Sequence, residues 1–198
     1  IAVLDADLRW GNLYVEPRAP GLAAYPFPLE PPLDRVLLVN LLARRSGLLL
    51  HGCGVVHGGQ GYLFLGPSGA GKSTLVKLWL AWEDVTVLGE ECLAVRARGS
   101  EYWLYGTPWI GESRAFSPSG ARLAGIYVLR HARENQARPL AVERALEMVL
   151  ARTFLPTYEL ANTQQVLDLC LDLVRAVPAH DFGFRPDATA VDYLRSAI

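Results

Sequence analysis

The stretch Gly66-Pro67-Ser68-Gly69-Ala70-Gly71-Lys72-Ser73 matches the pattern G-x-x-x-x-G-K-[ST] at every fixed position. The apolar residues 62–65 before it predict a buried strand. Residues 73–82 after it predict a helix with one apolar stripe, formed by Leu75, Leu78, Trp79 and Trp82. A strand, a glycine-rich turn and a helix together direct several backbone N–H groups and a helix N-terminus at one anion. We therefore predict a nucleoside triphosphate site here, over the alternative of a chance glycine turn before an ordinary helix.

Two side chains of this stretch are expected to act on the phosphates. Lys72 supplies a mobile positive charge for the β- and γ-phosphates, and the Ser73 hydroxyl is a ligand for Mg²⁺. Thr74, the next residue, completes the predicted nucleotide-binding set of residues 66–74. No base-reading motif is recognisable, so the choice between ATP, GTP and another phosphoryl donor stays open, and so does the fate of the phosphate.

Composition describes a globular chain and limits its partners. Of the 198 residues, 51% are hydrophobic and 20% charged, which supports one sizeable core. The net charge of −1 argues against electrostatic nucleic-acid binding, and no apolar run is long enough to predict a membrane partner. Three widely spaced cysteines predict reduced thiols and a cytoplasmic location. The chain begins with Ile1 rather than Met, which leaves room for an upstream segment.

Turn and periodicity signals predict a mixed, hairpin-rich sheet with flanking helices. Residues 1–4 and 13–15 predict a hairpin, and the six prolines of residues 17–32 predict a connector. We therefore divide the chain into 1–32 and a domain at 33–198 that contains the phosphate loop. Helices are predicted at 33–45 (ended by Gly47), 73–82, 142–154, from an Asn162 cap to about 176, and after an Asp187 cap. Strands are predicted at 48–51, 54–57, 62–65, 85–88, 93–97, 101–105, 124–130 and 178–184.

The turn at residues 58–61 matters most among these signals. Its sequence Gly-Gly-Gln-Gly is typical of a tight hairpin that leads directly into the strand before the phosphate loop. In most phosphate-loop proteins that strand lies in a parallel sheet, whereas here it is predicted to have an antiparallel neighbour.

Glu90 and Glu91 are the main candidates for metal and proton chemistry. They lie 18 and 19 residues beyond Lys72, after an apolar strand. Phosphate-loop enzymes hold Mg²⁺ with a carboxylate at such a place. We predict that one carboxylate serves the metal and that the other accepts the proton of an attacking hydroxyl. The alternative is a solvated acidic turn.

Histidines and a cysteine ahead of the loop are weaker candidates. His51, Cys53 and His57 alternate along one stretch, but the intervening glycines and the missing fourth ligand argue against a metal site formed by all three. His51 alone is predicted to contact the γ-phosphate, against the alternative of a partly buried histidine satisfied by the backbone. His131 and His180 have no partner in the sequence and are assigned a structural or exposed role.

Residues 106–120 form a loop rich in Gly, Pro and Ser, with many polar groups for a connector. Loops on a rigid scaffold often carry binding residues. Glu112 and Arg114 are predicted to contact substrate, metal or phosphate, and Trp109 to stack on a ligand or to be buried.

The order of His51-Gly52, a hairpin, the phosphate loop and an acidic pair after a strand resembles the catalytic domain of the HPr kinase/phosphorylase superfamily. It is more similar to the small stand-alone HPr-kinase-like proteins that include lasso-peptide serine kinases. The resemblance extends from about residue 48 to the C-terminus and includes 106–109, 111–112 and 184–187. It implies a phosphoenolpyruvate-carboxykinase-like P-loop fold, and a family that tends to form homo-oligomers.

By position, the resemblance gives Lys72 and Ser73 the phosphate and the metal, and it matches His51 to the family's histidine. Glu90 and Glu91 match the family's Asp-Asp pair, but each is one methylene longer. A shift of about 1 Å in a catalytic group can cost about 10²-fold in rate. The resemblance thus implies a Mg²⁺- and ATP-dependent kinase that phosphorylates a serine of a peptide, protein or small acceptor. The alternative is a catalytically impaired, nucleotide-binding regulatory or maturation partner.

Two other functions are not favoured. The separate phosphorylase signature of the bifunctional enzymes is not visible, so reversal by phosphorolysis is not predicted. A motor-type or switch NTPase is disfavoured because a hairpin-rich sheet differs from the parallel core of those proteins.

Overall fold

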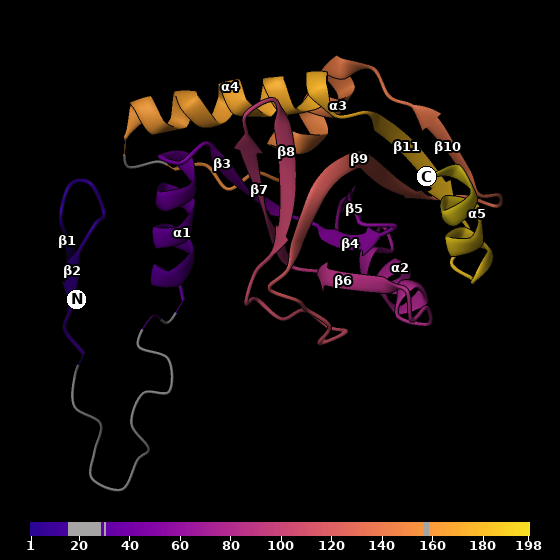
Figure 1. The fold of residues 1–198 in the computed structure, drawn as a ribbon, viewed down its shortest axis with the longest axis horizontal. Helices are drawn as coiled ribbons and strands as arrows, with labels where there is room; N and C mark the ends of the chain where they lie inside the picture. The colour runs from indigo at the N-terminus through magenta and orange to yellow at the C-terminus, as the bar shows by residue number, and fades with distance from the viewer. Residues whose placement is uncertain (16–28, 30, 157–158) are drawn as a thin grey trace, which may run out of the picture.

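The structure, a computed structural model, describes residues 1–15, 29, 31–156 and 159–198. Within them, five helices surround a curled, mixed β-sheet (Figure 1). The helices are α1 (Leu33–Ala43), α2 (Lys72–Trp79), α3 (Val142–Leu150), α4 (Leu160–Ala176) and α5 (Thr189–Ala197). The strands are β1 (Ala2–Leu4), β2 (Gly11–Leu13), β3 (Gly47–His51), β4 (Cys53–His57), β5 (Gln60–Leu65), β6 (Val85–Gly89), β7 (Cys92–Arg98), β8 (Glu101–Gly106), β9 (Gly120–His131), β10 (Gln136–Pro139) and β11 (Ala179–Phe184).

The main sheet has the strand order β3-β7-β8-β9-β5-β4-β6, and β11 and β10 extend it from β9. Strand β5 pairs antiparallel with β4 on one side and parallel with β9 on the other. The β4–β5 turn places Gly58 and Gly59 at φ +58° and +77°, which a two-residue hairpin turn requires and glycine allows at little cost. The predicted hairpin and mixed α/β sheet are confirmed, whereas the finer carboxykinase-like assignment stays a prediction.

Side chains alternate across the central strand, so both faces of the sheet are buried. On β5, Leu63 and Leu65 join a core with α3 and α4, whereas Tyr62 and Phe64 join a second core with α2 and α5. Figure 1 shows α3 and α4 over one side of the sheet and α2 and α5 on the other. Helix α1 covers the β3 end, where Leu49 contacts it in a third cluster.

Several predicted boundaries differ from the structure. Helix α1 ends at Ala43, and the predicted terminator Gly47 is wrong because it already belongs to β3, while Ser46 takes the left-handed turn at φ +53°. Strand β10 was not predicted, because its sequence QARP has no apolar pattern and it forms only by pairing with β11. Strand β9 is longer than the predicted 124–130.

The predicted helix caps have mixed outcomes. Asn162 is wrong as a cap: it lies inside the first turn of α4, buried, with its Nδ2 donating to Glu159 Oε2 at 2.8 Å. Asp187 does receive the N–H of Thr189 at 3.1 Å, where α5 begins.

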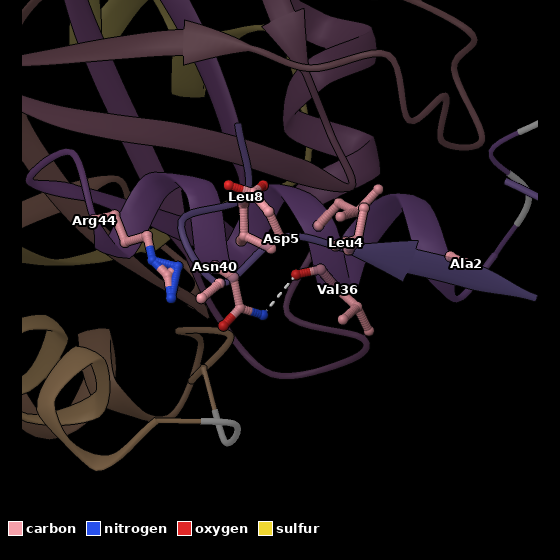
Figure 2. Close-up of a pocket in the computed structure, with 9 residues that line it drawn as sticks. Ala2, Leu4, Asp5, Leu8, Val36, Asn40 and Arg44 are labelled. Atoms are coloured by element: carbon pink, nitrogen blue, oxygen red, sulfur yellow. Dashed lines mark hydrogen bonds between the residues drawn. The ribbon is translucent and has the colours of Figure 1, made fainter. Parts of the chain in front are cut away.

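The N-terminal hairpin is confirmed, although its second strand begins at Gly11 rather than at residue 13. A cavity of about 290 Å³ lies between this hairpin and α1. In its wall, Asn40 Nδ2 donates to the Val36 carbonyl at 2.8 Å (Figure 2). The cavity has no residue of the phosphate loop in its wall. Most of the predicted proline-rich connector lies outside the described residues, and the division at residue 32 stays a prediction.

Two further findings concern predicted properties of the chain. Cys53, Cys92 and Cys170 are buried free thiols, as predicted, whereas the cytoplasmic location stays a prediction. Among the helices described, none is both long and apolar enough to span a bilayer.

Candidate functional site

The phosphate loop begins at the edge of the sheet where three parallel strands end. Strand β5 leads into the loop. Strand β9 pairs parallel with β5 and ends at His131, and β11 pairs parallel with β9 and ends at Phe184. Gly71 precedes α2 at φ +94°, and a Cβ there would lie 2.5 Å from Phe184 Cζ. The position is therefore restricted to glycine by both conformation and space.

A cavity of about 470 Å³ brings most of the predicted site together. It is lined by His51, Ser68, Gly69, Gly71, Lys72, Ser73, Thr74, Glu90, Glu91, Glu112 and His131. Gly66 and Pro67 line a neighbouring cavity of about 490 Å³, which shares His51 and Ser68 with the first. Ala70 is buried beneath the loop. Predicted residues from four separate segments of the chain thus meet around the phosphate loop, together with His131.

The Lys72 ammonium lies over the loop that precedes it. Its Nζ donates to the carbonyls of Gly66 at 2.9 Å and Pro67 at 3.1 Å. Partial burial lowers the pKa of Lys72, because desolvation disfavours its charged form. Two of the three ammonium donors are therefore used by the loop, and one is left for a ligand.

Glu90 is a buried carboxylate that is only half satisfied. It is 4% exposed, and its Oε1 accepts the N–H of Ser113 at 2.6 Å. Its Oε2 is buried without a hydrogen-bond partner among the described residues. A buried charged oxygen without a partner is costly, so a cation fits this place. The alternative of a solvated acidic turn is wrong for Glu90.

Glu91 has a different environment from its neighbour. Its side chain is 38% exposed, and its Oε1 lies 3.9 Å from Arg35 Nη2 and 4.0 Å from His51 Nδ1. Ion pairs this exposed add little stability, but they orient the carboxylate. The two adjacent glutamates are therefore distinct: one is fixed and buried, and the other is accessible.

The loop at 106–120 packs against Glu90 and adds a further carboxylate, Glu112, to the wall of the cavity. A Cβ on Gly111 would collide with the Glu90 side chain, so the loop approaches that carboxylate closely. Glu112 pairs with Lys77 at 2.7 Å, and hydrogen bonds from Lys77 and then Ser73 lower the pKa of Glu112. Glu112 therefore lies next to the predicted metal ligand Ser73.

The same loop is tied to the first turn of α1. Trp109 Nε1 donates to Asp34 Oδ2 at 2.8 Å, and the Arg35 guanidinium lies 5.6 Å from the centre of the Trp109 ring. Arg114 is exposed at φ +58° and does not line the cavity, so its predicted contact stays a prediction.

The trio of His51, Cys53 and His57 does not gather. His51 ends β3 and the other two lie on β4, so the three do not share one continuous strand face. Cys53 is fully buried, and His57 faces Asp84 at 3.6 Å. Among the described residues, no three His, Cys, Asp or Glu side chains are grouped to hold a metal by themselves. Mg²⁺ next to a nucleotide needs only one or two carboxylates, because phosphates supply other ligands.

Two site residues were not found from the sequence. His131 was assigned a structural or exposed role, but its Nε2 lies 2.7 Å from the Gly69 carbonyl oxygen, at the cavity. Arg152 Nε donates to the Gly66 carbonyl at 3.1 Å, beside the neighbouring cavity. Both are distant from the motif in sequence. For His131, one signal was available: it lies at the end of a strand, β9, that runs parallel to β5 and therefore ends at the same edge of the sheet as the loop.

Comparison with known proteins finds structural similarity without a sequence family. No protein-family model and no curated protein matches this chain. Among solved structures, the HPr(Ser) kinase/phosphatase from Coxiella burnetii is similar to it, with a TM-score of 0.43 and 11% identity, covering 75% of this chain and 97% of that one. A similarity of this size supports no statement about activity, and membership of the HPr-kinase-like group stays a prediction.

Proposed function

We propose that this chain is a Mg²⁺- and ATP-dependent kinase that transfers the γ-phosphoryl group to a serine hydroxyl of a peptide, protein or small acceptor. The observation that carries the proposal is the Glu90 carboxylate, buried and half unpaired, in the wall of the same cavity as the phosphate loop. A buried carboxylate would repel the phosphates bound by the neighbouring loop, unless a cation between them neutralises both charges.

The phosphate end of the site is formed by the loop and two side chains. Lys72 binds the β- and γ-phosphates with its remaining ammonium donor and stabilises the charge that develops on the leaving oxygen. Ser73 and Glu90, with Glu112 beside Ser73, would hold Mg²⁺. When bound, Mg²⁺ neutralises phosphate charge and orients the transferred group.

The acceptor end is assigned to Glu91, with His51 beside it. Glu91 is the accessible carboxylate, so it accepts the proton of the serine hydroxyl. The serine oxygen forms a bond to the γ-phosphorus, and the bond from that phosphorus to the β–γ bridging oxygen breaks. ADP leaves, and the proton remains on Glu91 until it exchanges with water.

The second candidate is a nucleotide-binding regulatory or maturation partner without turnover. The Glu-Glu pair favours it, because each side chain is one methylene longer than the Asp that the resemblance implies. Against it, Glu90 is fixed by the Ser113 N–H and fits tightly against Gly111, so the longer side chain has a defined place.

A transfer assay separates the two candidates. The protein is incubated with Mg²⁺, γ-labelled ATP and a panel of serine peptides, and label in the peptide is measured. We expect transfer by the wild type and by Glu83→Gln, a control at an exposed glutamate, and none by Lys72→Ala or Glu90→Gln. Tight ATP binding without transfer to any peptide would refute the kinase and support the binding partner.

A further inference from the structure

His131 and Phe184 pack against the phosphate loop at Gly69 and Gly71. They end β9 and β11 as register partners, and their rings stack with centroids 5.9 Å apart. Phe184 is fully buried and fills the space in front of Gly71, while His131 Nε2 lies 2.7 Å from the Gly69 oxygen. The last residues of two neighbouring strands therefore contact both left-handed glycines of the loop.

The contact at Gly69 determines which ring nitrogen of His131 carries a hydrogen. A backbone carbonyl only accepts hydrogen bonds, so His131 Nε2 carries a hydrogen and donates it. Gly69 and Gly71 have φ +78° and +94°, and glycines in a loop have more conformational freedom to lose than any other residue. A donor fixed at the end of a strand restricts the peptide plane after Gly69, and with it the shape of the loop.

We propose that His131 is a positioning residue for nucleotide binding, because it holds the phosphate loop in its binding shape through the Gly69 carbonyl. The inference rests on the proposed nucleotide site but not on phosphoryl transfer. A loop that is already in its binding shape loses less freedom when the ligand binds, so affinity rises. One neutral hydrogen bond of this kind corresponds to about a three- to tenfold change in Kd.

Two substitutions separate the hydrogen bond from the ring stacking. His131→Phe keeps a ring against Phe184 and loses the donor, whereas His131→Gln loses the ring and keeps an N–H donor. His180→Gln is the matched control, because His180 lies on β11 against Tyr127, away from the loop.

The probe is ADP with Mg²⁺, titrated by calorimetry, after thermal unfolding has shown that each variant is folded. We expect Kd to rise about three- to tenfold in His131→Phe and to stay within about twofold of the wild type in His131→Gln and His180→Gln. In the transfer assay, His131→Phe should raise KM for ATP and leave kcat unchanged. Amide hydrogen exchange at residues 66–73 should be faster in His131→Phe alone.

Three results would overturn the inference. Wild-type affinity in His131→Phe would show that the donor is unimportant, and equal weakening in both His131 variants would assign the effect to the ring. Absence of ADP binding by the wild type would overturn both this inference and the proposed function. Tight ADP binding without any transfer would overturn the kinase alone, and the affinity series would still decide the role of His131.

Discussion

Glu90→Gln is expected to stabilise the empty protein while removing its response to metal. In the wild type, a charged oxygen is buried without a partner, and such a group costs about 1–3 kcal/mol or more. The amide keeps an oxygen for the Ser113 N–H and replaces the charge with a neutral group. We expect the free energy of unfolding to rise by about 1 kcal/mol, which for a chain of this size raises Tm by about 2–4 °C.

The same variant should lose the part of ligand stabilisation that depends on Mg²⁺. A ligand at 100 times its Kd stabilises the folded state by about 2.7 kcal/mol. Urea unfolding followed by tryptophan fluorescence, with EDTA or with Mg²⁺ and ADP, measures both effects. Glu91→Gln is the control: its half-exposed side chain should change the stability of the empty protein little.

Opposite results would refute this reasoning. If Glu90→Gln is less stable than the wild type in EDTA, the carboxylate is satisfied in the empty protein. If it also keeps the full Mg²⁺-dependent stabilisation, Glu90 is not a metal ligand.

Three other predictions concern Gly71, Arg35 and the buried thiols. Gly71→Ala should destabilise the protein by more than about 1 kcal/mol in urea unfolding and weaken ADP binding, because Phe184 leaves no room and φ is +94°. Arg35→Gln should lower kcat up to about fivefold without changing KM for ATP, because Arg35 approaches Glu91 and not the phosphate loop. Burial raises the thiol pKa from 9.0 to about 12 in Cys53 and to about 11 in Cys92 and Cys170. Above about pH 9 these thiols therefore stay protonated in the folded protein but ionise in the unfolded chain. The free energy of unfolding should therefore fall between about pH 9 and 11, by up to about 1.4 kcal/mol per pH unit for each thiol, and this slope should decrease when one of them is replaced by Ala (Cys53, Cys92 or Cys170).

Local signals predicted much of this fold. The turn at Gly58 and Gly59 specified the hairpin, because a tight turn needs positive φ at both residues and glycine allows it. The apolar segments on either side of the turn then pair as β4 and β5. The phosphate-loop motif specified the strand and helix around it in the same way. Strand β10 was missed because it forms only by pairing with β11. The start of α4 was misplaced because Glu159, rather than Asn162, is the residue that precedes the helix.

The site was predictable only where its residues lie close to the motif or to a strand end. The sequence indicated Glu90 and Glu91, but it did not show that one is buried and the other accessible. That difference comes from Ser113 and Gly111, which approach Glu90 from a loop more than 20 residues away. His131 and Arg152 were missed for the same reason: their roles arise when distant segments pack against the loop.

The tie between α1 and the loop at 106–120 has a consequence for how the chain is divided into modules. Every residue of the phosphate-loop motif and both glutamates lie after residue 48, so a shortened chain starting there would still carry the whole signature. It would lack Asp34, which holds the Trp109 indole, and Arg35, which approaches Glu91. The segment that carries the sequence motif is therefore smaller than the segment whose residues contact one another around the site.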